Sequence, residues 1–240
     1  MIKKQKGTDL IWGIHAVRAA LRNPRRTVEK VFVTQEGIAQ KINQNIGGLC
    51  TCVSLQELEK YVPKGSVHQG VLAFASLLSP LSLAHLDPEK GVVLALDEVV
   101  DPHNVGALWR SAAAFGAQAL ILTKHNSPSL DGTVSKSACG AMDHVPYVYV
   151  TNLVHTLISL QKKGFFIAGL QEKGAIPLHQ SALWPLVLVV GAEGKGLRRL
   201  TQEHCDQLLF IECGPHFQTL NASVAGAIAL QHFYHMKSRL

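Results

Sequence analysis

The side chains best suited to chemistry lie in three loops, and the first loop spans residues 97–110. Its sequence reads DEVVDPHNVGALWR, so that acidic residues and Asp101-Pro102 end an apolar stretch and Asn104 precedes a helical pattern. An asparagine here can cap the helix through its side chain. Arg110 follows under two turns later, within reach of the strand end. Taken alone, the loop fits both a capped helix with an exposed arginine and a site that uses both side chains.

The second loop spans residues 190–197 and reads VGAEGKGL, directly after an apolar strand. Three glycines in six residues allow a backbone to approach a ligand closely. The loop is not a Walker loop, because Gly follows Lys195, and its glycine spacing is not that of a dinucleotide fingerprint. Glu193 in its middle must face water, Arg110 or a ligand, because an unpaired buried carboxylate is costly. A nucleotide-binding turn is one interpretation of this loop.

The third loop spans residues 211–225 and reads IECGPHFQTLNASVA. Ile211 ends a strand, Gly214-Pro215 turns the chain, and Thr219, Asn221 or Ser223 can cap the last helix. That helix continues through several small residues, which permit close contact with another helix. By itself the loop fits a tight helical packing arrangement as well as a site.

The elements that must position these loops alternate between strands and helices. Alternation of this kind predicts a parallel sheet covered by helices on both faces, and ligands of such sheets bind beyond the carboxyl ends of the strands. Strands are predicted at 92–99, 118–124, 145–150, 165–170, 185–191 and 207–212, and helices at 105–117, 152–163, 196–204 and 221–240.

A smaller α/β module precedes this pattern. GIHAVRAALRN has apolar residues at helical spacing and Asn23-Pro24 to end the helix, and short strand and helix signals follow up to residue 76. A segment with two prolines and no periodicity comes next. The predicted domains are therefore residues 1–76, a linker over 77–90, and residues 91–240.

The net charge of +6 is concentrated at the N-terminal end. Residues 1–30 hold eight basic and two acidic side chains, so the remaining residues are balanced. A basic end on a neutral body is typical of a surface that docks a polyanion such as nucleic acid, although a solubilising tail has the same composition.

Several classes of protein are disfavoured by the sequence. The five cysteines and twelve histidines show neither zinc-finger nor HExxH spacing, so no metal site is predicted. No apolar run approaches the about 18–20 residues that span a bilayer, and no secretory leader pattern follows the basic start. We expect a soluble cytoplasmic protein with no membrane partner.

The three loops in this order resemble the motifs of the SpoU/TrmH branch of the SPOUT superfamily of RNA 2′-O-ribose methyltransferases. The resemblance covers essentially the whole chain. It rests on GIHAVRAAL and VHQGVLA in the N-terminal module and on DPHNVGALWRSA, KSACGAMDHVP, VGAEGKGLRRLTQEHCD and TLNASVA after it. Members that methylate a guanosine ribose in bacterial large-subunit ribosomal RNA are the most similar.

The resemblance implies a fold, a reaction and its partners. The fold would be a parallel-sheet α/β methyltransferase domain with a deep C-terminal trefoil knot, preceded by a small L30e-like α/β domain that binds the RNA substrate. The reaction would be S-adenosylmethionine-dependent 2′-O-methylation of a ribose in ribosomal RNA, with guanosine as the expected nucleotide. It would be carried out by a homodimer that shares its active site partly through the last helix.

The resemblance also implies residue roles, position by position. Arg110 would stabilise the developing alkoxide as a cation and hold a phosphate, or act as the general base with that phosphate's help. Asn104 would orient Arg110, and Glu193 would hold Arg110 or the target nucleotide. The catalytic and substrate-positioning residues would be Arg110, Asn104, Glu193 and Asn221, and the cofactor-binding residues Gly191, Ile211, Leu220 and Thr219.

Two positions depart from the family pattern. Glu212 stands where the family usually has proline, and Thr219 stands where it usually has serine; threonine keeps the hydroxyl. Three alternatives stay open. One is an inactive RNA-binding member of the fold, with Thr219 and Glu212 as the degenerated positions. The others are a transfer-RNA 2′-O-methyltransferase and an unrelated nucleotide-dependent enzyme that uses GAEGKG as a phosphate loop.

The basic N-terminal end generates a first prediction. Deleting residues 1–76 should weaken RNA binding and reduce its dependence on salt, because a protein that touches fewer phosphates releases fewer counterions. Titration of RNA at several salt concentrations measures that slope. An unchanged slope would mean that RNA docks elsewhere.

Overall fold

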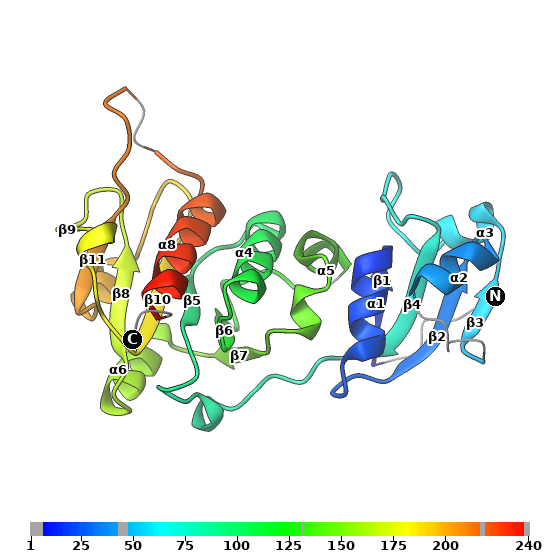
Figure 1. Cartoon of the computed structure of the whole chain (residues 1–240), viewed down its shortest axis with the longest axis horizontal. Helices are drawn as coiled ribbons and strands as arrows, with labels where there is room; N and C mark the ends of the chain where they lie inside the picture. Colours follow the sequence, from blue (N-terminus) through cyan, green and yellow to red (C-terminus); the bar gives the residue numbers. More distant parts are fainter. Residues whose placement is uncertain (1–6, 43–47, 131, 217–218, 238–240) are drawn as a thin grey trace. The chain divides into compact units, whose positions relative to one another are not determined.

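The computed structural model describes residues 7–42, 48–130, 132–216 and 219–237 and divides the chain into two compact units. The N-terminal unit comprises residues 1–79 and 129–144, and the C-terminal unit comprises residues 80–128 and 145–240. Each unit holds one sheet and the helices that cover it (Figure 1).

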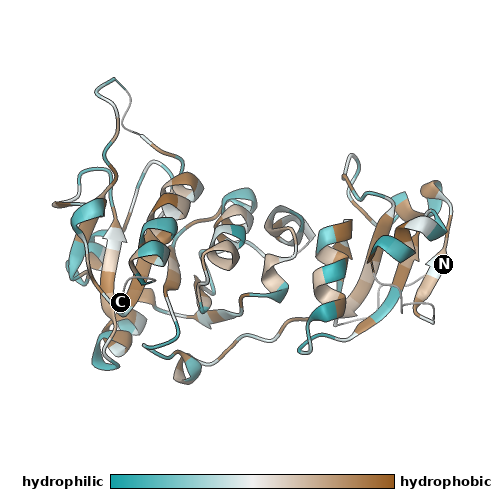
Figure 2. Ribbon diagram, in the orientation of Figure 1, coloured by the Kyte–Doolittle hydropathy of each residue, from teal (hydrophilic) through white to brown (hydrophobic). Residues whose placement is uncertain are grey.

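The N-terminal unit is built on a four-stranded sheet in the order β1-β4-β2-β3, in which only β2 and β3 are parallel. Helix α1 covers one face through Ala16, Val17 and Ala20, as its apolar spacing predicts. Its two differently coloured sides are visible in Figure 2. The strands are β1 (Thr8–Trp12), β2 (Val28–Val33), β3 (Cys50–Cys52) and β4 (Val71–Ser76), and the helices of residues 1–79 within this unit are α1 (Ile14–Arg22), α2 (Glu36–Ile42) and α3 (Leu55–Glu59).

Residues 129–144 pack into the N-terminal unit, although the predicted domain bounds placed them in the C-terminal domain. They form α5 (Gly132–Ala138) and the 3-10 turn η2 (Ala141–Asp143), neither of which the sequence pattern predicted. At Gly132 a Cβ atom would lie 1.7 Å from the Trp12 ring, so only glycine fits there. The segment thus belongs by packing to a unit from which it is distant in sequence.

A buried ion cluster fixes this segment. The Arg26 side chain is 1% exposed and pairs with Asp9 and, at 3.1 Å, with Asp143 Oδ2. Asn23 Nδ2 donates to the other Asp143 oxygen at 2.9 Å. Since buried charges must be compensated, the cluster holds η2 against the chain after α1. Deleting residues 1–76 would remove these partners of Asp143. Substituting exposed arginines such as Arg25 disturbs the fold less, and these variants therefore suit the RNA titration at several salt concentrations better.

The C-terminal unit is an α/β structure on a seven-stranded sheet in which all neighbours are parallel, in the order β7-β6-β5-β10-β8-β11-β9 (Figure 1). The six predicted strands are confirmed, and a short strand, β9, was not predicted. The strands are β5 (Val93–Asp97), β6 (Ala119–Thr123), β7 (Tyr147–Val150), β8 (Phe166–Leu170), β9 (Ile176–Pro177), β10 (Leu186–Gly191) and β11 (Gln207–Phe210).

Helices cover both faces of this sheet, as predicted. Helix α6 buries Leu153, Leu157 and Leu160 on the face that includes Val187 and Val189 of β10. On the other face α8 packs against α4, and at Gly226 a Cβ atom would lie 2.3 Å from Leu108. The small residues of the last helix thus serve close helix contact. The helices of the unit are α4 (Pro102–Ala114), α6 (Leu153–Lys162), α7 (Arg199–Glu203) and α8 (Ala222–Lys237), and its 3-10 turns are η1 (Leu83–His85) and η3 (Leu178–Gln180).

Within the described residues, no helix has both the length and the apolar character that a membrane span requires.

The ion cluster generates a second prediction. Arg26→Ala would remove the buried positive charge that pairs with Asp9 and Asp143 and should lower the free energy of unfolding by about 3–5 kcal/mol. Chemical denaturation followed by circular dichroism measures the decrease. Arg25→Ala, at an exposed neighbouring position, is the control and should change stability by no more than about 0.5 kcal/mol. Equal effects of the two variants would contradict a structural role for the cluster.

Candidate functional site

The three loops singled out in the sequence meet at the carboxyl edge of the C-terminal sheet. Asn104 Nδ2 donates to Glu193 Oε2 at 3.0 Å, and Asn221 Nδ2 donates to Asn104 Oδ1 at 3.0 Å. Asn221 Nδ2 also lies 3.4 Å from Glu193 Oε2. One side chain from each loop therefore takes part in a single hydrogen-bonded triangle, here called the Asn-Glu-Asn triangle.

Asn104 reaches this triangle because it does not cap its helix, contrary to one interpretation of the sequence. Helix α4 begins at Pro102, and Asp101 is the cap, with its carboxylate accepting from the His103 N–H at 2.9 Å. Proline suits the first turn because the N–H it lacks would have no helical partner. Asn104 therefore lies inside the first turn, is buried, and has its amide available to bond other loops.

Tight turn geometry brings Glu193 into position. Gly191 ends β10, and a Cβ atom there would lie 2.3 Å from the carbonyl carbon of Gly196. Ala192 and Gly196 exchange two backbone hydrogen bonds of 3.2 and 2.8 Å, which close the loop on itself. Gly194 and Gly196 have φ of +77° and +65°, in the region that favours glycine. The glycines thus build a narrow turn with Glu193 on it.

Asp97, which is fully buried at the end of β5, anchors the far side of the same loop. Its two oxygens accept from Arg198 Nε at 2.7 Å and from the Arg198 backbone N–H at 2.9 Å. Sequence reasoning missed this pair, although an acid directly after a run of apolar strand residues was the available signal. The contact ties the chain after the glycine turn to the neighbouring strand.

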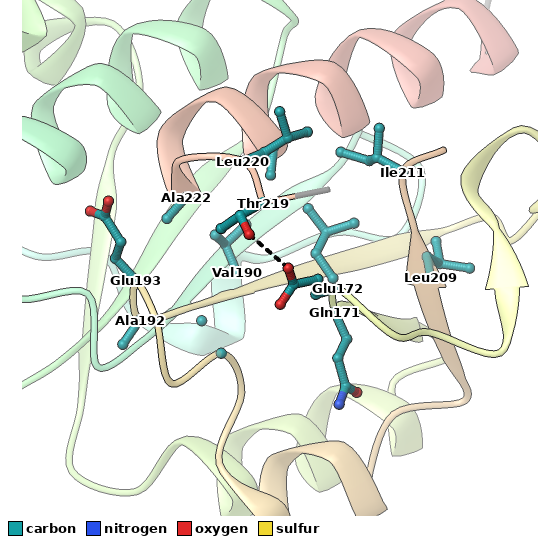
Figure 3. A pocket seen from close by; sticks show the side chains of 15 residues that line it. Gln171, Glu172, Val190, Ala192, Glu193, Leu209, Ile211, Thr219, Leu220 and Ala222 are labelled. Atoms are coloured by element: carbon teal, nitrogen blue, oxygen red, sulfur yellow. Dashed lines mark hydrogen bonds between the residues drawn. The ribbon is translucent and has the colours of Figure 1, made fainter. Parts of the chain in front are cut away.

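A pocket lies beside the triangle, and Figure 3 shows the side chains that line it. All four predicted cofactor-binding residues line it: Gly191, Ile211, Leu220 and Thr219. So does Glu193, which links the pocket to the Asn-Glu-Asn triangle. The remaining lining residues are Leu170, Gln171, Glu172, Val190, Ala192, Gly194, Gly196, Leu209, Ala222 and Ala225.

The contribution of β8 to this pocket was not predicted. Leu170 ends β8, which lies between β10 and β11 in the sheet, so Leu170 and the two residues after it emerge at the same edge as Gly191 and Ile211. Thr219 Oγ1 donates to Glu172 Oε1 at 2.9 Å. The signal that could have found them was the sheet order, which a single sequence does not reveal.

Two other sequence-derived positions are absent from the pocket lining. Arg110 is exposed on α4, six residues after Asn104, and does not line the pocket. Glu212 does not line it either, because its carboxylate pairs with His179 Nδ1 at 2.8 Å in an exposed contact. The departure at Glu212 therefore places its charge toward η3 and not toward the pocket.

Neither a metal group nor a reactive Cys205 thiol is indicated in the described part of the chain. His, Cys, Asp and Glu side chains there form no group of three that suits a metal ion. Burial, helped by the nearby Asp206 and Asp97 carboxylates, raises the pKa of Cys205 to about 12. That thiol is therefore neutral and unreactive near neutral pH.

Comparison with known proteins gives matches over both units. Residues 91–231 match the SpoU rRNA Methylase family, and residues 10–81 match the family of RNA 2′-O ribose methyltransferase substrate-binding domains. Two relatives, from Vibrio parahaemolyticus and Pseudomonas aeruginosa, are 38% and 39% identical and carry the name 23S rRNA (guanosine-2′-O-)-methyltransferase RlmB. Each alignment covers 92% of this chain and 94% of the relative.

A solved structure shares the fold. The SpoU methyltransferase AviRb from Streptomyces viridochromogenes, in complex with AdoMet, superposes with a TM-score of 0.82 at 19% identity. The superposition covers 98% of this chain and 92% of AviRb.

Proposed function

The chain belongs to the SpoU rRNA methylase family, and from this membership we propose that it methylates the ribose 2′-hydroxyl of a guanosine in 23S ribosomal RNA with S-adenosylmethionine. The observation that carries the proposal is the Asn-Glu-Asn triangle beside a pocket lined by all four residues that match the family's cofactor contacts. The relatives of 38–40% identity are named for the same reaction.

The pocket suits this cofactor. Leu170, Leu209, Ile211 and Leu220 offer apolar walls for an adenosyl group, and the glycine turn leaves its backbone open to a ligand. Gly191, Ile211, Thr219 and Leu220 would hold the cofactor there. When bound, S-adenosylmethionine supplies a methyl group on a positively charged sulfur.

The Asn-Glu-Asn triangle would position the acceptor ribose. Because Asn104 bonds both Glu193 and Asn221, we infer that it fixes those two side chains, in addition to the orientation of Arg110 that the family resemblance implies. Holding a hydroxyl in line with the methyl group can contribute several kcal/mol, up to about 7–11 in ideal cases. The triangle supports a fixed arrangement of this kind.

Arg110 would act on the developing charge. Methylation of the ribose oxygen would require its hydroxyl proton to leave, to water or to an oxygen of a neighbouring phosphate. A guanidinium stays protonated in proteins, so we assign Arg110 the stabilisation of the alkoxide and the binding of that phosphate. The general-base role is the alternative, and both roles require the guanidinium.

The finer features of the family follow as proposals. We assign the C-terminal segment a deep trefoil knot, the N-terminal unit an L30e-like fold that binds RNA, and the protein a cytoplasmic location. The knot is proposed from the membership of the family. A homodimer joined partly by α8 is supported by exposed Val224, Ile228 and Tyr234 on that helix.

The alternatives are less well supported. A transfer-RNA substrate has no counterpart among the named relatives of 38–40% identity. An inactive protein would be expected to have lost polar site contacts, whereas the triangle is intact and the Thr219 hydroxyl donates a hydrogen bond. A phosphate loop would not explain the Glu193 contacts.

Single-turnover assays with labelled S-adenosylmethionine and unmodified 23S ribosomal RNA test the proposal. The wild type should yield 2′-O-methylguanosine on nuclease digestion and mass spectrometry. Arg110→Ala should lower the rate at least about 10²-fold, because the alkoxide loses its counter-charge, and should leave cofactor affinity nearly unchanged. Methylation of a base, or full activity of Arg110→Ala, would contradict the proposal.

A further inference from the structure

The pocket has an unbalanced charge. Its fifteen lining residues include two carboxylates, Glu172 and Glu193, and neither lysine nor arginine. Lys173 and Lys195 are close in sequence to these acids, yet neither lines the pocket. A concave site with this composition favours a cationic ligand over a neutral ligand of the same shape.

The two carboxylates are engaged differently. Glu193 accepts from the amides of Asn104 and Asn221, so its Oε2 atom is committed to the triangle. Glu172 follows β8 and, among the described residues, accepts one hydrogen bond, from the Thr219 hydroxyl at 2.9 Å. An ionised carboxylate offers about four acceptor positions, so this single bond orients the group and leaves it able to attract a ligand.

Glu172 lies in the pocket lining, where its charge would act on a bound ligand. Figure 3 shows its carboxylate among the lining side chains, between Thr219 and the strands, whereas Gln171 points the other way. Thr219 is one of the two departures from the family pattern, and here its hydroxyl restrains an acid. The pair therefore joins two segments, residues 170–172 and 219–220, around the pocket.

We propose that Glu172, oriented by Thr219, is a specificity-determining residue that recognises the positive charge of the cofactor sulfonium. The inference rests on the proposed function. Methyl transfer converts S-adenosylmethionine into S-adenosylhomocysteine, in which the sulfur has lost one methyl group and one positive charge. Glu172 attracts the first ligand more than the second, so the spent cofactor leaves more readily than the fresh one.

Isothermal titration with both ligands tests this residue without any methylation reaction. Glu172→Gln keeps the size of the side chain and an oxygen that accepts from Thr219, so it removes little besides the charge. The affinity for S-adenosylmethionine should fall about fivefold, as expected for a solvent-accessible ion pair worth roughly 1 kcal/mol. The affinity for S-adenosylhomocysteine should change less than about twofold. Added salt should reduce the preference of the wild type but not that of the variant.

Two controls separate charge recognition from a change of pocket shape. Glu203→Gln removes an exposed acid of α7 that pairs with Arg199 outside the pocket, and should leave both affinities unchanged. Thr219→Ser keeps the hydroxyl and should retain the preference of the wild type, whereas Thr219→Val removes it and should weaken the preference.

Equal decreases in affinity for both ligands in Glu172→Gln, or no decrease, would overturn this inference and leave the proposed function standing. A wild type that binds neither ligand would overturn both.

Discussion

The hydrogen bonds among Asn104, Glu193 and Asn221 are the constraint on which the site depends. These residues come from segments that are separated by up to 117 positions in sequence. They meet because the loop after β5, the loop after β10 and the start of α8 all lie at one edge of a parallel sheet. A buried amide such as that of Asn104 needs partners, so any shift of one loop would leave a polar group unsatisfied.

The requirement that buried polar groups have partners also applies to charged residues near the site and in the N-terminal unit. Asp97 at the end of β5 binds Arg198 twice and so fixes where the glycine turn ends. Arg26 with Asp9 and Asp143 secures residues 129–144 in the N-terminal unit. In each case removal of one partner would leave a charge in a region of low dielectric, which makes the arrangement specific. The N-terminal unit thus includes a segment of the chain that the family match assigns to the methylase region.

Sequence periodicity predicted the six main strands of the C-terminal sheet, because buried parallel strands are continuous apolar runs. It also predicted the three loops and the apolar face of α1. It proposed Asn104 as a cap of α4, whereas the cap is Asp101, since both residue types cap helices well. It missed α5, whose small and polar residues show no apolar period, and it missed Glu172, whose place in the pocket depends on the strand order. The sequence showed only that Glu212 departs from the family pattern, because its pairing with His179 is a tertiary contact.

A double-mutant cycle between Asn104→Ala and Asn221→Ala, read by single-turnover methyl transfer, tests the central claim most directly. If the triangle acts as one unit, the second substitution should cost much less once the first is present. The two residues should then show an interaction free energy of about 1 kcal/mol or more. Effects that add to within about 0.5 kcal/mol would show that the loops act independently and would contradict the account.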